Sequence, residues 1–202
     1  MKYPAGAILS RNSVPKLLGS YECELHEIIE SALRSNYHQV IDVGSAEGYY
    51  AVGFALKRGR HVVAFDTDPR ELMQCREMAR LNAVEDLIET HHWCSPEILR
   101  VLAANVPCFI LSDCEGYETE LFDEATVAGL TRSDVLIEIH GGAYEPLLER
   151  FSKTHAVRTL VALDRSASDY PELACLGGDG ARAVAEYRPR GQRWLFAKSL
   201  AG

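Results

Sequence analysis

Five short strand-like segments recur at nearly even spacing in the 202-residue chain, and this spacing constrains the fold more than any other feature of the sequence. They are predicted to be β-strands at residues 39–43, 61–66, 88–93, 108–113 and 134–140. Their first residues lie 22, 27, 20 and 26 positions apart, which leaves room for one helix between each pair. Strands that alternate with helices in this way indicate βαβ units and a parallel sheet. Four of these segments contain continuous apolar residues without alternation, at 40–41, 62–65, 109–111 and 135–137, as expected for strands covered on both faces.

Further elements are expected on both sides of these five strands. A helix is predicted over 21–34, before the first strand, and another over 143–151, after the fifth. Residues 156–163 and 193–198 have the composition of two more strands. The stretch 164–180 between them is rich in Asp, Ser, Gly and Pro, which predicts a loop or a partly ordered insertion.

Two of the predicted helices have clear starts. Asp68-Pro69 and Ser95-Pro96 each place a capping residue before a proline at the first helical position, directly after a predicted strand. Together these patterns predict an α/β fold with a doubly wound, Rossmann-like, seven-stranded, mostly parallel sheet and helices on both faces. No stretch has the composition of a linker, so a single domain over residues 1–202 is expected.

The composition narrows the classes of partner. The 29 acidic residues outnumber the 21 lysines and arginines, for a net charge of −8, which argues against bulk electrostatic binding of nucleic acid. No apolar run is long enough to cross a membrane, and residues 1–9 are expected to form a flexible terminus rather than a secretory signal. The six cysteines contain no Cys-x-x-Cys pair, which is typical of free thiols in a reducing compartment. We therefore expect a cytoplasmic protein.

A turn of small residues follows the first predicted strand. The segment spans residues 42–48 and leads into a predicted helix. Its candidate binding residues are Asp42, Gly44, Ser45, Ala46 and Gly48. In an open α/β sheet, such a turn is where a ligand meets the N-terminus of a helix. The Gly-x-Gly-x-x-Gly and P-loop fingerprints are absent. Asp42 would repel a pyrophosphate and suits a cationic group, such as the amino group of an amino-acid-bearing cofactor. The alternative is a purely structural turn.

A second acidic position follows the next strand. Asp66 lies about twenty residues after the glycine turn, where a carboxylate can accept hydrogen bonds from both hydroxyls of a ribose. Thr67 is adjacent and belongs to the same candidate binding segment. Asp68 is predicted to cap the following helix. A capping role for Asp66 is the alternative.

Taken together, the two turns resemble those of class I S-adenosylmethionine-dependent methyltransferases. The family's acidic residue and glycine turn stand here as Asp42-Val-Gly44-Ser-Ala46-Glu-Gly48, with alanine at the middle glycine position. The resemblance implies that Gly44 to Gly48 hold the methionine part of the cofactor and that Asp66 holds the ribose. It also implies that residues 37–141 form the cofactor-binding core, between a helical segment (1–36) and the C-terminal strands and insertion (142–202). Adenine contacts would come from the end of the third strand, at His92, Trp93 or Cys94, and Trp93 is kept as the candidate.

A narrower resemblance, to the FkbM family of methyltransferases, covers residues 19–141. It is carried by Gly19-Ser20-Tyr21-Glu22, Asp113-x-Glu115-Gly116-x-Glu118 and Glu138-x-His140. Members mostly methylate oxygen on small molecules and sugars. The resemblance therefore implies transfer to a hydroxyl of a small-molecule or sugar acceptor.

The predicted strand order 3-2-1-4-5 brings three candidate residues to one edge of the sheet. Asp42, Asp113 and His140 would line up there, at the ends of neighbouring strands. Asp113 is the candidate for lining both the cofactor and acceptor sites, and Glu115 follows it in the loop. His140 has a suitable ordinary pKa for a general base, and Glu138 could orient it or contact an acceptor.

The same residue types are compatible with two further roles. Ser112 to Glu115 also fit a helix capping box. Asp113, Glu115, Glu138 and His140 could hold Mg²⁺, although no metal site is assigned. We predict a cofactor-dependent methyltransferase acting on a small-molecule oxygen. The alternatives are a non-catalytic module that binds the same cofactor and an aminopropyltransferase-like enzyme.

Overall fold

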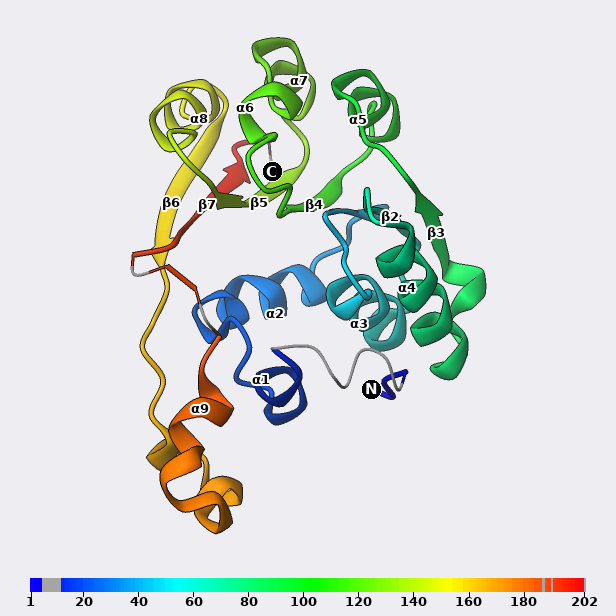
Figure 1. Cartoon of the computed structure of the whole chain (residues 1–202). Coiled ribbons are helices and arrows are strands. Elements are labelled where there is room, and N and C mark those ends of the chain that lie inside the picture. Colours follow the sequence, from blue (N-terminus) through cyan, green and yellow to red (C-terminus); the bar gives the residue numbers. More distant parts are fainter. Residues whose placement is uncertain (5–11, 187, 190, 202) are drawn as a thin grey trace.

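A computed structural model describes residues 1–4, 12–186, 188–189 and 191–201 of the chain. At its centre is a seven-stranded sheet with the order β3-β2-β1-β4-β5-β7-β6 (Figure 1). The strands are β1 (Gln39–Val43), β2 (Val62–Phe65), β3 (Ile88–His91), β4 (Cys108–Ser112), β5 (Asp134–Ile139), β6 (His155–Val161) and β7 (Arg193–Ser199). Strands β1 to β5 pair in parallel, and β7 pairs antiparallel with both β5 and β6. The predicted seven-stranded, mostly parallel sheet is confirmed.

Helices form a layer on each face of this sheet. Helices α5 to α8 lie over one face, and α2 to α4 lie over the other (Figure 1). The α-helices are α1 (Ser13–Leu18), α2 (His26–Arg34), α3 (Tyr49–Arg58), α4 (Pro69–Leu81), α5 (Pro96–Leu102), α6 (Glu118–Leu121), α7 (Glu124–Gly129), α8 (Tyr144–Phe151) and α9 (Gly180–Val184). Short 3₁₀-helices are η2 (Cys23–Leu25), η3 (Glu85–Leu87), η4 (Ala167–Asp169) and η5 (Pro171–Asp179).

Each layer has its own apolar core, which accounts for the unbroken apolar strands. Leu99, Phe122 and Phe151 are buried with Ile41 on the face covered by α5 to α8. Val40 is buried with side chains of α2, α3 and α4 on the opposite face. Because successive side chains of a strand point to opposite faces, Asp42 lies on the same side as Val40, toward α3. The register of β1 therefore sets the position of this carboxylate.

The two predicted helix starts are confirmed. The Asp68 carboxylate accepts a hydrogen bond from the Arg70 backbone N–H (2.8 Å), and the Ser95 hydroxyl accepts one from Ile98 (3.3 Å). Proline follows each capping residue at the first position of α4 and α5. Both helices therefore begin directly behind the strand ends that carry the candidate site.

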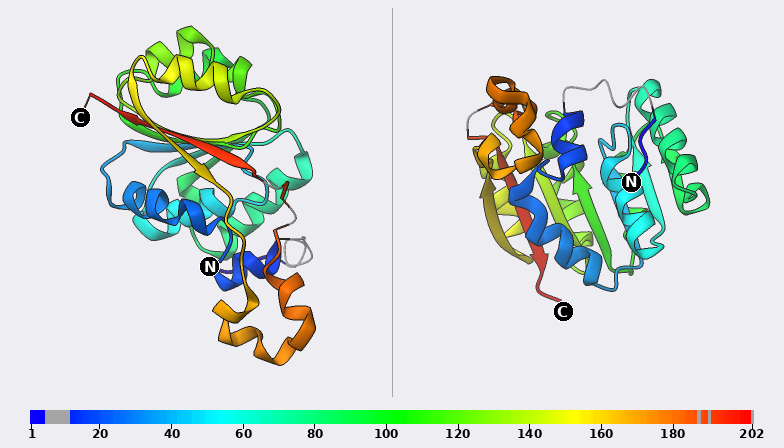
Figure 2. Two further views of the ribbon diagram at one scale, coloured as in Figure 1. Left: turned by 90° about the vertical axis from the view of Figure 1, so that its left-hand side faces the viewer. Right: turned by 90° about the horizontal axis from the view of Figure 1, so that it is seen from below.

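The segment between β6 and β7 is more regular than its composition indicates. Residues 164–180 were expected to form a loop or a partly ordered insertion, but η4, η5 and the start of α9 lie in this region. These elements extend away from the sheet, with α9 beside α1 (Figures 1 and 2). Turns this short carry no apolar period, which is why a sequence pattern does not predict them.

The flexible terminus expected over residues 1–9 falls mostly outside the described residues, which resume at residue 12. Helix α1 follows immediately. Among the described helices, none is long and apolar enough to cross a membrane.

Candidate functional site

The turn after β1 is built around two glycines that no other residue could replace without strain. Gly44 has φ 84°, and a Cβ added there would lie 1.7 Å from the backbone oxygen of Asp113. Gly48 has φ 92°, and its Cβ would lie 2.7 Å from the Cys75 sulfur. Ala46 also has a left-handed φ, 45°, at the position where the resembled family has glycine. The turn therefore presses its backbone against the end of β4, where Asp113 lies.

Asp42 lies beneath this turn as a buried carboxylate. Only 1% of the residue is exposed, and neither oxygen has a well-formed hydrogen bond within the described part of the chain. Burial raises the pKa of Asp42 to about 7, against the lowering effect of the Ala51 backbone amide. A buried acid without a partner costs stability unless it has a cationic ligand to receive. Asp42 thus has the properties expected of a binding group for a positive charge.

Asp66 holds the glycine turn in place. Its Oδ2 accepts a hydrogen bond from the backbone N–H of Ala46, and its Oδ1 accepts one from Asp68, both at 2.8 Å. The bond from Ala46 links the turn after β1 to the end of β2, and the bond from Asp68 lies within the loop before α4. Each carboxylate oxygen has a second lone pair, so the group can still accept hydrogen bonds from hydroxyls. The predicted ribose contact of Asp66 stays a prediction.

Two cavities meet at Gly44 and Asp113, which line both of them. Cavity A, about 50 Å³, is also lined by Asp42, Ser45 and Ala46. Cavity B, about 140 Å³, is also lined by the predicted adenosine-side residues Asp66, Thr67 and Trp93. Neither cavity reaches the several hundred Å³ of a typical small-ligand site. A ligand the size of a nucleoside with an amino-acid tail must therefore occupy both and pass over Gly44.

Aromatic rings form one wall of cavity B. The ring centroids of Trp93 and Tyr117 lie 4.7 Å apart, and Trp93 is 47% exposed. Flat apolar faces of this kind suit a heteroaromatic base. The sequence singled out Trp93 but carried no signal for Tyr117. Of the predicted cofactor-binding residues, Gly48 alone lies away from both cavities, behind the turn.

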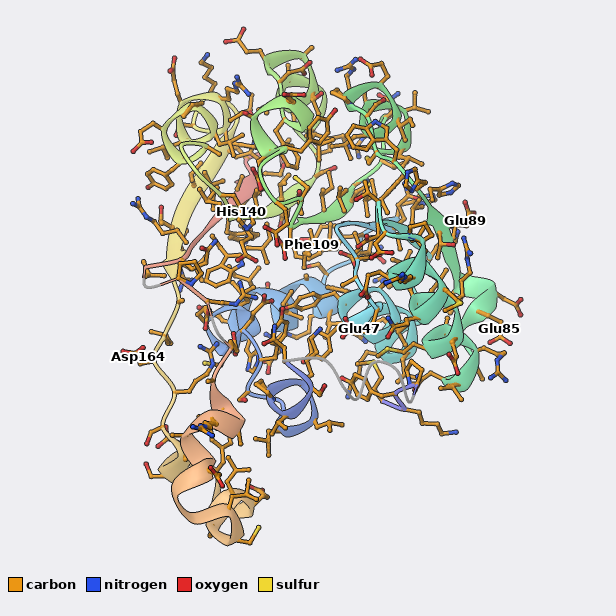
Figure 3. The ribbon with its side chains drawn as sticks, viewed as in Figure 1. Glu47, Glu85, Glu89, Phe109, His140 and Asp164 are labelled. Carbon is orange, nitrogen blue, oxygen red and sulfur yellow. The ribbon has the colours of Figure 1, made fainter. Side chains whose placement is uncertain are left out.

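His140 is held in a fixed orientation next to the shared end of the cavities. Its Nδ1 lies 2.6 Å from Oε1 of Glu118, which also accepts the Gly116 backbone N–H at 3.0 Å. The opposite ring nitrogen, Nε2, lies 3.7 Å from Asp113 and 3.5 Å from Glu115. The three predicted catalytic residues are thus brought together. Figure 3 shows His140 at the end of β5.

The carboxylates strongly perturb this histidine. The hydrogen bond to Glu118 is the main cause that raises the pKa of His140 to about 9. Burial acts to raise the pKa of Glu118, but its bonds to His140 and Gly116 outweigh burial and hold it below its usual value. Burial, followed by repulsion from Glu138, raises the pKa of Asp113 to about 8. Burial thus favours the neutral form of Asp113, whereas the bond to Glu118 favours the charged form of His140.

Glu118 ends the Asp-x-Glu-Gly-x-Glu motif, but the sequence indicates no role for it. It is fully buried at the first position of α6, and positive φ values at Glu115 (53°) and Gly116 (109°) turn the chain back toward β5. The alternative interpretation of this loop as a capping box is wrong. Ser112 lies within β4, and its hydroxyl donates to the Cys114 sulfur at 3.5 Å.

A second missed residue is Arg188, which precedes β7. Its guanidinium donates to the carboxylates of Glu22 and Glu138 and pairs with Glu186 at 3.2 Å. It also donates to the Tyr21 hydroxyl at 3.0 Å. The Tyr21-Glu22 motif noted in the sequence is thus an acceptor for an arginine 166 residues away. The burial of Glu22, which makes it require a cation, is not visible in the sequence, so no sequence signal pointed to Arg188.

The contacts of Arg188 bear on whether the acidic residues and His140 could hold Mg²⁺, which the sequence left open. Glu138 is paired with Arg188, which leaves Asp113, Glu115 and His140 with ligand atoms within 4.8 Å of one another. Mg²⁺ prefers oxygen ligands in a near-octahedral arrangement, whereas this set offers two carboxylates and one imidazole, and Glu115 is 83% exposed. The residues fit Mg²⁺ poorly, and no step is assigned to a metal.

Comparison with known proteins identifies the fold. No protein-family model and no curated protein sequence matches the chain. The chain is similar to the crystallised MTase domain of METTL16, with a TM-score of 0.60 and 15% identity over 100% of this chain and 73% of that one. It is similar to a Methanobacterium thermoautotrophicum protein described as precorrin 8w decarboxylase, with a TM-score of 0.57 and 14% identity over 88% and 90%.

A third similar structure is larger. The bifunctional kinase-methyltransferase WbdD has a TM-score of 0.53 and 14% identity over 93% of this chain, which spans 40% of WbdD. At these identities the likeness concerns the fold, which is that of structures described as methyltransferases. The narrower resemblance to the FkbM family stays a prediction.

Proposed function

We propose that this protein is an S-adenosylmethionine-dependent methyltransferase that transfers the methyl group to a hydroxyl oxygen of a small molecule or sugar. The observation that carries the proposal is the meeting of cavities A and B at Gly44 and Asp113, next to the buried Asp42, whose oxygens have no well-formed hydrogen bond among the described residues. Cavity A suits the amino-acid part of the cofactor, and cavity B, with Asp66 and Trp93, suits the adenosine. The fold shared with the METTL16 MTase domain and with WbdD supports this assignment.

The arrangement of charges fits a cationic cofactor. The cofactor supplies a methyl group on a positively charged sulfur, open to in-line displacement by oxygen. Asp42 and Asp113 line cavity A, so positive charge there is favoured by both carboxyl groups. Gly44 brings the turn's backbone against Asp113, and both residues line the two cavities. The chain thereby holds the reacting centre in one position, and positioning supplies much of the acceleration of such a displacement.

His140 is the group that removes the proton of the acceptor hydroxyl. Glu118 keeps Nδ1 as the donor of one fixed hydrogen bond, so Nε2 is the atom that faces Asp113 and Glu115. With a pKa of about 9, the imidazole is protonated in the free protein near pH 7. Nε2 releases its proton more readily when positive charge occupies the adjoining cavity, because like charges disfavour the imidazolium. This couples the base to occupation of the site.

Calorimetry with S-adenosylhomocysteine tests the cofactor assignment, with NAD⁺ as the matched control ligand. We expect binding of the first and none of the second, since the turn lacks the dinucleotide fingerprint. A panel of hydroxylated small molecules and sugars is then screened for release of S-adenosylhomocysteine. His140→Asn should retain cofactor binding and lose turnover. The absence of binding at millimolar ligand would refute the assignment, and binding without turnover on any acceptor would favour a non-catalytic module.

A further inference from the structure

Lys16 is a buried lysine that reaches the glycine turn from outside the sheet. It lies on α1, and its Nζ is 2.5 Å from Oε1 of Glu47, which is in the turn before α3 (Figure 3). The two side chains are only 8% and 7% exposed. The ammonium also lies 4.7 Å from the ring centroid of Tyr21 and 5.4 Å from that of Tyr49. A lysine this buried is uncommon and is held by specific contacts.

The charge of cavity A makes this lysine distinctive. The acidic residues that line the cavity are Glu22, Asp42, Asp113 and Glu138. Among the described residues that line it, Lys16 is the single lysine or arginine. Cavity B has none among its described lining residues. The nearby Arg188 guanidinium is already paired with Glu22, Glu138 and Glu186. Lys16 is therefore the cation in the described lining of cavity A that can attract a ligand carboxylate.

Four backbone N–H groups of the glycine turn are already engaged in hydrogen bonds within the protein. The N–H groups of Gly44 and Ser45 both donate to the Phe65 carbonyl, at 2.8 and 2.9 Å. The N–H of Ala46 donates to the Asp66 carboxylate, and the N–H of Gly48 donates to the Ser45 carbonyl. The side-chain hydroxyl of Ser45 is different, because it is buried in the lining of cavity A and has no hydrogen-bond partner in the described part of the chain. A buried hydroxyl without a hydrogen-bond partner in a cavity wall indicates that a ligand supplies the partner.

We propose that Lys16 and the Ser45 hydroxyl bind the α-carboxylate of the cofactor's amino-acid part, while Asp42 receives its α-ammonium. This inference rests on the proposed function and names the residues that recognise the zwitterionic end of the cofactor. Lys16 turns from Glu47 to the bound carboxylate or is shared between them. Recognition of this end then depends on α1, which lies outside the sheet and its two helix layers (Figure 1).

Three ligands separate this role from a general effect on the fold. S-adenosylhomocysteine has both the ammonium and the carboxylate, its decarboxylated analogue has the ammonium alone, and 5′-methylthioadenosine lacks the whole tail. For Lys16→Met, we expect at least tenfold weaker binding of S-adenosylhomocysteine by calorimetry, which corresponds to about 1.4 kcal/mol. Binding of the other two ligands should stay within about twofold of the wild-type value, because neither presents a carboxylate.

Matched variants control for charge and stability. Lys153→Met removes the same charge from an exposed site on the far side of the sheet and should leave all three affinities unchanged. Lys16→Arg should restore most of the affinity for S-adenosylhomocysteine. Glu47→Gln removes the competing carboxylate and should retain or strengthen that binding.

The outcomes separate the two proposals. Equal losses of affinity for all three ligands in Lys16→Met, or no loss for any, would overturn the role of Lys16. Wild-type protein that binds S-adenosylhomocysteine no better than its decarboxylated analogue would also overturn it and leave the cofactor pocket standing. A preference for the decarboxylated analogue would in addition favour an aminopropyltransferase-like enzyme. Wild-type protein that binds none of the three nucleosides would refute the proposed function itself.

Discussion

His140 has one available orientation because Glu118 fixes one of its ring nitrogens. The carboxylate of Glu118 has no exposure to solvent, and its Oε1 also accepts the Gly116 backbone N–H. A buried, charge-assisted hydrogen bond is stronger than an exposed one, because water does not compete for its donor and acceptor. At the scale of single residues, the properties of the site therefore depend on groups that contact neither cavity directly.

The pH dependence of stability follows from these contacts. The hydrogen bond to Glu118 raises the folded-state pKa of His140 to about 9, against 6.5 for an ordinary histidine. The resulting stabilisation is complete below pH 6.5 and is lost as the pH rises through about 9. The raised pKa of Asp113, about 8 because of burial, adds a loss of the same sign as the pH rises. We expect the free energy of unfolding, measured with urea at pH 6 to 9, to fall over this range.

Glu118→Gln tests the assigned cause. The variant keeps the shape of the side chain and removes the charge, so the pKa of His140 should move back toward its ordinary value. Titration of the imidazole signals by NMR measures this directly, and the decline of stability with pH should become shallower. Identical His140 titrations in the variant and the wild-type protein would contradict the assignment.

Asp66 supports a second prediction at this scale. Asp66→Ala removes the acceptor of the Ala46 backbone N–H and the predicted ribose contact, so S-adenosylhomocysteine should bind more weakly by about 1–3 kcal/mol in calorimetry. Asp68→Ala is the matched control. It removes the cap of α4 and should cost about 1 kcal/mol of stability while binding stays unchanged. Equal binding losses in the two variants would remove Asp66 from the site.

At the scale of elements, the turn between β1 and α3 is the part that tolerates least change. Its backbone lies against the ends of β2 and β4 at the same time, through hydrogen bonds to Phe65 and close approach to Asp113. Helix α6 shows a related dependence, because a left-handed turn before it directs Glu118 toward β5. In both cases a short turn positions the helix that follows it.

Two glycine substitutions test the importance of the β1–α3 turn. Gly44→Ala should destabilise the protein strongly and abolish S-adenosylhomocysteine binding, because its Cβ would overlap the Asp113 carbonyl and its φ is positive. Gly53→Ala lies within α3 with no neighbouring atom within 4 Å of the added Cβ. It should raise stability by about 0.5–1 kcal/mol. Thermal unfolding and calorimetry measure both effects, and a binding-competent Gly44→Ala variant would contradict the described geometry.

At the scale of the whole molecule, the insertion between β6 and β7 is joined to the N-terminal region by a network of buried charges. Arg165 pairs with Glu24 at 2.6 Å and with Glu186 at 2.8 Å, and Arg188 pairs with Glu22 and Glu138. The network extends from the chain before β1 to the end of β5. It therefore connects the insertion to residues that line cavity A.

Loss of one arginine should expose how much stability this network provides. Arg188→Met leaves the carboxylates of Glu22, Glu138 and Glu186 without their shared cation and should destabilise the protein by about 3–5 kcal/mol. Arg182→Met, on the exposed side of α9, should change stability by less than about 0.5 kcal/mol. Urea unfolding of both variants measures the difference. Equal stability of the two would show that the insertion is energetically independent of the sheet.

Local patterns in the sequence were sufficient to predict much of the fold and part of the site. Strand spacing predicted the parallel core, and the usual order of a doubly wound sheet predicted the arrangement of its first five strands. The Asp-Pro and Ser-Pro pairs predicted two helix starts, and the glycine turn predicted the tight bend at Gly44. Such features depend on residues within about one turn or one strand of each other, so their physical causes are visible in a short window.

Tertiary structure alone decided which charges meet. Lys16 and Glu47 are 31 residues apart, Glu118 and His140 are 22 apart, and Glu22 and Arg188 are 166 apart. No local period relates such residues, because each contact depends on how separate elements pack in space. Burial then determines the charge state and partners of these groups. A carboxylate removed from water is stable only when it pairs with a cation, accepts hydrogen bonds or takes up a proton. The sequence by itself therefore specified the sheet and the turn, and the packing of the chain specified the electrostatics of the site.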